Sequence, residues 1–443
     1  MISLAWTMAR AGGWGRLALL AGCSAAVSGL LLVAVALLGF NDTADEQLAS
    51  FVQDGGTRGG VVFAVLLLTL PPLLLLDQAV RLGSAHRDRR LAALRVVGAT
   101  PGEVRRFGAI EVGIPTSVGA VLGIAVFAVL RALLGGRQYD SGGYFGSNFA
   151  IVPRTGPPSP WQMAMVVILV AVVGTVVGWW ASRAVVTSPL GVTRRQSNRP
   201  PRPWGLVLML AAAVLASKAP SSDHSEIFAF IAIALMVGAF VVLAPWVAFV
   251  IARRLVRRTD SAWALLAAQR IVAQPGAAGR AAAAIGGISL VSGGVVGFVR
   301  YVRDSGNVED SSYMAGAILV AVSLVIGLLV ATGSMAVHSV ESLMDRRREV
   351  AFLAASGMLE AELELAARKE ITVVALPLAA AGSALGAATL SLMGDGSLAG
   401  LLTTLVLGVG VTVVLVWLAA VAAVRAVRPW SRRAASPVNL RTE

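Results

Sequence analysis

Long apolar runs, separated by short polar segments, make up most of the chain. A helix of about 20 apolar residues is long enough to cross a bilayer. Ten runs approach or exceed this length, at positions 16–40, 59–80, 107–134, 163–184, 204–217, 227–252, 281–299, 312–337, 371–393 and 398–424. The pattern predicts an all-α polytopic membrane protein with about ten transmembrane helices. The second run contains Pro71-Pro72, where we expect a kink.

Two arginine-rich polar segments, 87–111 and 346–370, each separate one apolar run from the next. One constant offset aligns them at Leu94 and Leu353, Gly98 and Gly357, Glu103 and Glu362, and Glu111 and Glu370. In each segment, apolar residues recur at helical spacing and are followed by a glycine, which commonly ends a helix. Each segment is therefore predicted to contain a short amphipathic helix.

The distribution of basic residues indicates how the chain crosses the membrane. With the N-terminus inside, only seven of the 37 lysine and arginine residues fall outside: Arg58, Arg131, Arg137, Arg154, Lys218, Arg300 and Arg303. Cytoplasmic loops carry an excess of basic residues. We therefore expect a multi-pass protein of the cell membrane. Both termini and the segments 87–106 and 346–369 would be cytoplasmic, and 135–161 would be outside. The same rule favours two crossings, or a re-entrant pair, for the short fifth run and the sixth.

The order of features in the first half returns in the second half. Val27-Ser28-Gly29 in the first run matches Val291-Ser292-Gly293 in the seventh, and Arg16 matches Arg280 at the same offset. Both halves begin in the cytoplasm, so the copies are predicted to be parallel and related by an axis along the membrane normal. This gives two four-span repeats, 1–186 and 259–443, joined by a connector, 187–258, that holds spans five and six.

Composition excludes several functional classes. Only 14% of residues are charged and the mean hydropathy is +0.78, which leaves little room for a large soluble domain. The net charge of +13 fits positive-inside loops better than a nucleic-acid partner. Cys23 is the only cysteine, and the three histidines form no metal-binding motif, so no metal site is expected. The sequence has no phosphate-binding P-loop motif, so any ATP hydrolysis would belong to a partner.

Three acids lie near the ends of apolar runs: Asp77, Glu111 and Glu370. Acidic residues inside a membrane are candidates for function. The alternative, which we favour for Glu111 and Glu370, is an interfacial ion pair with a nearby arginine, namely Arg105, Arg106 or Arg368. The centres of the runs hold almost no acids, which disfavours a proton relay. Two arginine clusters, 253–258 and 428–433, are expected to bind anionic membrane lipid.

The first arginine-rich segment resembles a motif of the FtsX-like, or MacB-like, permeases of ABC transporters. The residues 89–100, RRLAALRVVGAT, are similar to that family's segment after the second span of its four-span unit. Glu111 at the start of the next run and the C-terminal 436–441, SPVNLR, add to the resemblance. The second copy departs from the motif, because it lacks the arginine after Leu353 and the Ala-Thr after Gly357.

The resemblance implies two coupling helices that dock on an ABC ATPase subunit, present in two copies. Its residues would be Arg89, Arg90, Leu91, Leu94, Arg95 and Gly98 in the first copy, and Arg348, Val350, Leu353 and Gly357 in the second. ATP and Mg²⁺ would be bound by the ATPase, and this chain would hold no cofactor and catalyse no reaction itself.

The loops 41–58 and 300–311 are short, whereas the family usually has a large external domain after its first span. The layout is therefore similar to permeases linked to antimicrobial-peptide export. The expected function is export or extraction of an amphipathic peptide or lipid, driven by the ATPase. A signal transmitter driven by an ATPase, without transport, is an alternative, and a secondary transporter is a weaker one.

Overall fold

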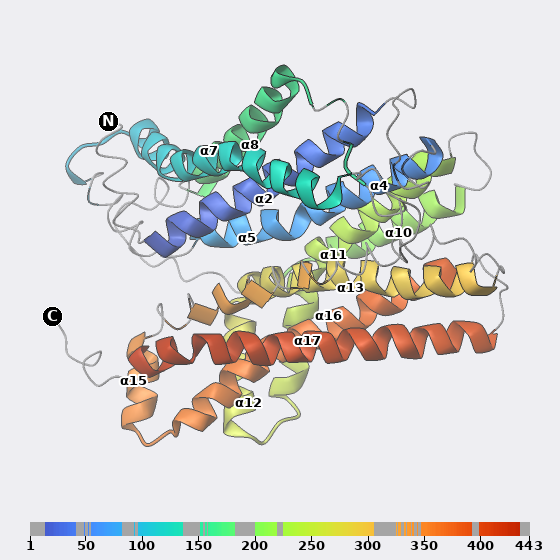
Figure 1. Cartoon of the computed structure of the whole chain (residues 1–443). Helices are drawn as coiled ribbons and strands as arrows, with labels where there is room; N and C mark the ends of the chain where they lie inside the picture. The colour runs from blue at the N-terminus through green and yellow to red at the C-terminus, as the bar shows by residue number, and fades with distance from the viewer. Residues whose placement is uncertain are drawn as a thin grey trace. The chain divides into compact units, whose positions relative to one another are not determined.

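The structure, a computed structural model, consists of helices. It describes residues 14–40, 48, 52, 55–81, 93, 96–135, 151–153, 156, 158–181, 200–218, 225–304, 325, 327–328, 332–333, 335–337, 339–340, 343, 347–391 and 398–434. The helices are α2 (Trp14–Leu38), α4 (Gly55–Leu68), α5 (Leu70–Arg81), α7 (Pro101–Leu134), α8 (Pro160–Ala181), α10 (Trp204–Lys218), α11 (Ser225–Val256), α12 (Ala262–Ala273), α13 (Pro275–Asp304), α15 (Arg347–Ala355), α16 (Glu360–Ser391) and α17 (Leu398–Ala434) (Figure 1). Within these residues, β-pairing is limited to one isolated bridge, between Gly135 and Val152.

Seven stretches of the described chain are long and apolar enough to cross a membrane. They are Trp14–Leu38, Arg58–Val80, Pro101–Leu134, Pro160–Ala181, Ile227–Val256, Ala361–Thr389 and Ala399–Ser431. Shorter apolar helices, Trp204–Lys218 and Ala282–Gly297, lie where the fifth and seventh spans are expected. Most of the expected eighth span, 312–337, is outside the described residues. The all-α polytopic class is confirmed, whereas the number ten stays a prediction.

The kink expected at Pro71-Pro72 occurs as a one-residue break in the second span. Helix α4 ends at Leu68 and α5 begins at Leu70, with Thr69 between them. The two prolines lie in the first turn of α5, where a missing backbone N–H costs least. The Thr69 hydroxyl donates a hydrogen bond to the Leu66 carbonyl at 2.6 Å. The break thus follows from the proline pair.

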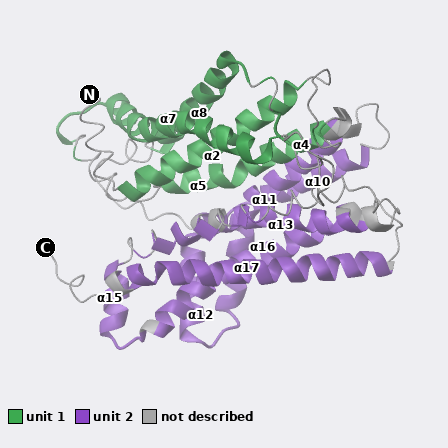
Figure 2. Ribbon diagram, viewed as in Figure 1, with its two compact units in different colours: residues 1–197 green, residues 198–443 purple. Residues whose placement is uncertain are grey.

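The chain divides into two compact units, residues 1–197 and 198–443 (Figure 2). The first unit contains α2, α4, α5, α7 and α8, and so includes the whole first predicted repeat. The second unit contains the other helices. Its α10 packs on α11, and α11 packs on α13, so the connector helices belong to the same compact body as the second predicted repeat.

Small residues allow α2 and α7 to pack closely in the first unit. A side chain at Gly119 would collide with Ser24, and one at Gly123 would lie 3.0 Å from the Ala25 carbonyl oxygen. The buried Ser28 hydroxyl donates to the Ala120 carbonyl of α7 at 2.9 Å. Small residues and interhelical hydrogen bonds drive helix association in lipid, where the hydrophobic effect between helices is weak. The seam fixes the first and third spans against each other.

An analogous seam joins α13 and α16 in the second unit. A side chain at Gly293 would collide with the backbone of Ser383, and one at Gly382 would lie 2.5 Å from the Gly286 carbonyl oxygen. Thr412 of α17 donates to Ser383 at 3.2 Å and lies 3.3 Å from Ser292 of α13. These hydroxyls connect three helices through buried and half-buried hydrogen bonds.

The neighbours of each helix recur in the two units. In the first, α7 packs on α2 and α8, and α2 contacts α8; in the second, α16 packs on α13 and α17, and α13 contacts α17. The matching motifs Val27-Ser28-Gly29 and Val291-Ser292-Gly293 lie on corresponding helices, α2 and α13. The same neighbours thus recur in the described helices of both units, and the division into two repeats stays a prediction.

Candidate functional site

Both arginine-rich segments make the same turn at their glycine. Gly98 has φ +106° and Gly357 has φ +98°, a left-handed conformation that glycine adopts without a Cβ penalty. Before Gly98, the Val97 N–H donates to the Ala93 carbonyl at 3.1 Å, as in a helical turn. At the second copy, the N–H groups of Met358 and Gly357 donate to the carbonyls of Leu353 and Ala354 at 3.1 and 3.2 Å. This pair of bonds is a Schellman motif, which ends α15.

A capped helix begins three residues after each glycine. At α7, Thr100 and Glu103 form a capping box: the Thr100 N–H donates to the Glu103 carboxylate at 2.8 Å, and the Glu103 N–H donates to the Thr100 hydroxyl at 3.3 Å. Pro101 occupies the favoured first helical position. At α16, the Leu359 N–H donates to the Glu362 carboxylate at 3.0 Å, but Leu359 has no hydroxyl to reciprocate. The second helix therefore has one of the two hydrogen bonds of a capping box, whereas the first has both.

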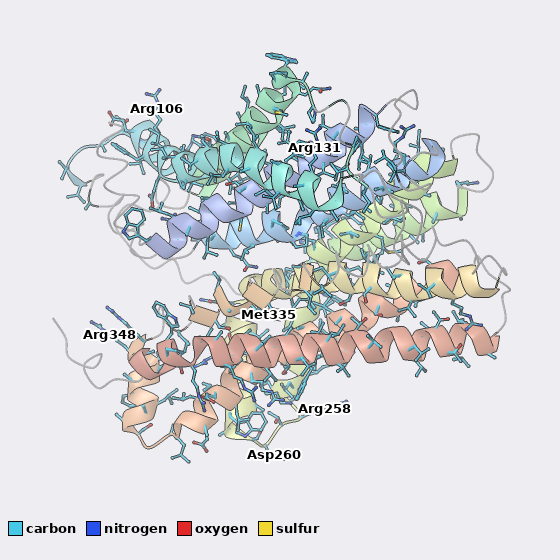
Figure 3. The ribbon with its side chains drawn as sticks, viewed as in Figure 1. Arg106, Arg131, Arg258, Asp260, Met335 and Arg348 are labelled. Carbon is cyan, nitrogen blue, oxygen red and sulfur yellow. The ribbon has the colours of Figure 1, made fainter. Side chains whose placement is uncertain are left out.

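Apolar side chains around both turns are exposed. Val96 and Val97 are 77% and 86% exposed in the first copy, and Phe352 is 66% exposed in the second. Arg106 and Arg348 are also exposed, and Figure 3 shows both side chains projecting away from their helices. The predicted contact residues Arg89, Arg90, Leu91, Leu94 and Arg95 lie outside the described residues.

The structure corrects the predicted contact face of α15. Val350 is only 2% exposed and lines a cavity of about 60 Å³ in its own unit, so it is not available to a partner. Leu353 is half-buried, and the exposed apolar side chain is Phe352, which the sequence analysis did not select. The spacing indicated an amphipathic helix, but only the packing of the unit determines which side is covered.

Glu111 forms a buried ion pair with Arg16, and not with Arg105 or Arg106 as expected. The distance from Arg16 Nη1 to Glu111 Oε1 is 2.5 Å, and both residues are 4% exposed. Arg16 is in the first turn of α2, and Glu111 is on α7. The same guanidinium donates from Nε to the Ala79 carbonyl at 3.3 Å and from Nη2 to the Val80 carbonyl at 3.4 Å. It thus contacts the last turn of α5 as well.

Glu370 pairs with Arg270 of α12 in the second unit, and not with Arg368 as expected. The distance from Arg270 Nη1 to Glu370 Oε2 is 3.7 Å, and the side chains are 10% and 15% exposed. Both residues line the cavity beside Val350, together with Met335, whose position is marked in Figure 3. The second pair is therefore longer and more open than the first.

The arginines expected to pair with these acids stack on tryptophan rings. The guanidinium carbon of Arg105 lies 5.3 Å from the ring centroid of Trp179 on α8, and that of Arg368 lies 4.9 Å from Trp417 on α17. A cation within about 6 Å of a tryptophan centroid is attracted by the ring. In each unit, one long helix, α7 or α16, therefore makes two contacts near the same end. Its glutamate forms an ion pair with an arginine, and its own arginine stacks on a tryptophan ring of α8 or α17.

These contacts place the other predicted residues and limit the chemistry. Asp77 is half-buried on α5, two and three residues before the carbonyls that Arg16 contacts. In the described part of the chain, no group of three or more His, Cys, Asp or Glu side chains could hold a metal ion. The arrangement is suited to holding helices together and to presenting exposed turns. The ion pair of Arg16 with Glu111 was not predicted, because the two residues are 95 positions apart in the sequence.

Comparison with known families supports the resemblance found in the sequence. Residues 61–190 match the model of the FtsX-like permease C-terminal domain. The matched range includes the second, third and fourth spans of the first unit, and the whole of the first arginine-rich segment. No curated protein matches the chain. The chain therefore contains an FtsX-like domain of the ABC permease family in its first half, while the MacB-like subtype stays an expectation.

Proposed function

We propose that the chain is the permease subunit of an ABC transporter in the cell membrane, and that it moves an amphipathic peptide or lipid. The observation that carries the proposal is the repeated build of the two arginine-rich segments. Each has a left-handed glycine, a capped long helix after it, and exposed apolar and basic side chains beside it. The first of them lies within the FtsX-like domain.

The exposed turns would be the contacts for the ATPase. Apolar side chains such as Val97 and Phe352 gain free energy when a partner groove covers them. Nearby arginines, Arg106 and Arg348 among the exposed ones, would attract acids on that partner. Two ATPase copies would bind the two segments, with ATP and Mg²⁺ held by the ATPases.

The long helices would carry the motion across the membrane. Helix α7 has 34 residues and α16 has 32, and at 1.5 Å per residue each is about 50 Å long. Each begins three residues after the glycine of its exposed turn and continues through the expected span. Closure of the ATPases would move the capped ends of α7 and α16, and the external ends would then move to expel or extract the substrate.

Co-purification tests the proposal directly. The tagged chain, expressed with the ABC ATPase encoded beside it, is expected to retain the ATPase in detergent and in lipid nanodiscs. Hydrolysis by the complex is expected to rise when an amphipathic peptide or lipid is added, and vesicles are expected to move that substrate only with ATP. Binding without transport would favour the signal transmitter, and uptake driven by a proton gradient without an ATPase would contradict the proposal.

A further inference from the structure

One guanidinium contacts the helix before the first arginine-rich segment and the last residue of that segment. Arg16 donates to the carbonyls of Ala79 and Val80, which lie eight and seven residues before the segment begins at position 87, and it pairs with Glu111 on α7. Glu111 lies ten residues after Pro101, or about 15 Å along α7. The last turn of α5, which precedes the segment, and the part of α7 around Glu111 therefore meet at one buried side chain of the first span.

We propose that Arg16 and Glu111 are positioning residues that make the first arginine-rich segment, α2, α5 and α7 move as one body. The inference rests on the proposed function, because it concerns how a force applied to the segment reaches the spans. Without the pair, the end of α5 and the first turns of α7 could move relative to the first turn of α2, because the seam between α2 and α7 lies further along both helices. With it, a displacement of the end of α5 or the start of α7 is passed to α2.

The chemistry of the site explains why an arginine and a carboxylate occupy these positions. Guanidinium has five N–H donors in a planar fork, so one side chain can pair with a carboxylate and still donate to two carbonyls in other directions. The carbonyls are in the last turn of α5, where the helix dipole is negative and a cation is favoured. A lysine ammonium is a compact point charge on a flexible stem, so it could not hold this fork-shaped set of contacts.

The second unit offers a matched comparison. Its Arg270–Glu370 pair is 3.7 Å long and partly exposed, and Arg270 comes from α12, not from the helix that corresponds to α2. Glu370→Gln removes the charge at the position that corresponds to Glu111. If burial and short contacts make the first pair the transmitting one, this substitution has the smaller effect on motion.

Spin labels on the expected external ends of α2 and α17 can measure the transmitted motion, because α17 belongs to the second unit and lies outside the proposed body. Leu38 ends α2 and Leu402 is near the start of α17, and they are 70% and 60% exposed. Labels would be placed at Leu38→Cys and Leu402→Cys with Cys23→Ala, in the complex of the full chain and its ATPase in nanodiscs. The distance between labels is measured without nucleotide and after trapping with ATP and vanadate.

The wild-type pair is expected to change its distance on trapping. Arg16→Lys and Glu111→Gln are expected to lose that change while they still co-purify with the ATPase and hydrolyse ATP, and Glu370→Gln is expected to keep it. The exchange Arg16→Glu with Glu111→Arg is not expected to restore the change, because it places a carboxylate against the α5 carbonyls. If Arg16→Lys does not fold, Glu111→Gln, which keeps the shape and an acceptor, decides the result.

Two results would overturn the inference. The first is a wild-type distance change in both Arg16→Lys and Glu111→Gln, or recovery of the change in the exchanged pair. The second is a wild-type complex that binds ATPase and hydrolyses ATP but shows no distance change on trapping. Failure of the wild-type chain to bind any ATPase would instead refute the proposed function itself, and the inference with it.

Discussion

Because Arg16 and Glu111 form a buried ion pair, removal of Glu111 alone is expected to destabilise the protein more than replacement of both residues. Glu111→Ala leaves the guanidinium at 4% exposure with only two longer bonds, of 3.3 and 3.4 Å, to carbonyls. An uncompensated buried charge of this kind costs about 3–5 kcal/mol. For a unit of this size, such a loss lowers the midpoint of thermal unfolding by roughly 10 °C. Thermal unfolding in detergent, followed by size-exclusion fluorescence, measures the shift.

The double variant Arg16→Met with Glu111→Leu separates charge from packing. Two apolar side chains of similar size remove both charges, and such replacements are often neutral. The carbonyls of Ala79 and Val80 lose the hydrogen bonds from Arg16, which costs about 1–3 kcal/mol. The double variant is thus expected to be more stable than Glu111→Ala alone. Equal destabilisation of both variants, or a loss below about 1 kcal/mol for Glu111→Ala, would refute this reasoning.

Three further predictions follow from the packing and the exposed turns. Gly123→Ala is expected to cost about 1–3 kcal/mol of stability, because it overpacks the seam between α2 and α7. Gly102→Ala serves as the control, because a Cβ at that position meets open space. Equal unfolding midpoints of the two variants would contradict the prediction. Val97→Cys with Cys23→Ala is expected to react with an impermeant maleimide only from the cytoplasmic side, and labelling in intact cells would contradict the topology. Leu94→Asp is expected to abolish co-purification with the ATPase and Leu353→Asp to weaken it less, since the first copy matches the family motif better; normal insertion is checked by size exclusion, and wild-type association for Leu94→Asp would contradict the docking role.

Local features were predictable because their causes lie within a few residues. The apolar runs gave the helices, and Pro71-Pro72 gave the break at Thr69. Gly98 and Gly357 were expected to end short helices, and both have a positive φ. In each case, the backbone conformation depends on steric preference or on a missing N–H at the residue itself, so the sequence alone is sufficient.

The contacts of the candidate site were not predictable in the same way. Glu111 was expected to pair with Arg105 or Arg106, which are five or six residues away on the same helix. Its actual partner is Arg16, which is 95 residues away and reaches it only because α2 packs along α7. Arg105 instead contacts the Trp179 ring of α8. Pairing across spans depends on helix rotation, which the small-residue seams set and which periodicity alone does not specify.

The described helix caps and ion pairs differ between the two units. The first copy has a complete capping box, and its acid is buried in a 2.5 Å ion pair; the second has half of the box, and its ion pair is 3.7 Å long and lines a cavity. The sequence shows the same inequality, because the second segment lacks Thr100's counterpart. A threonine hydroxyl is what completes a capping box, so this one difference in sequence accounts for one difference in structure. The Arg270–Glu370 pair differs from the Arg16–Glu111 pair for another reason, since Arg270 lies on α12 and not on α13.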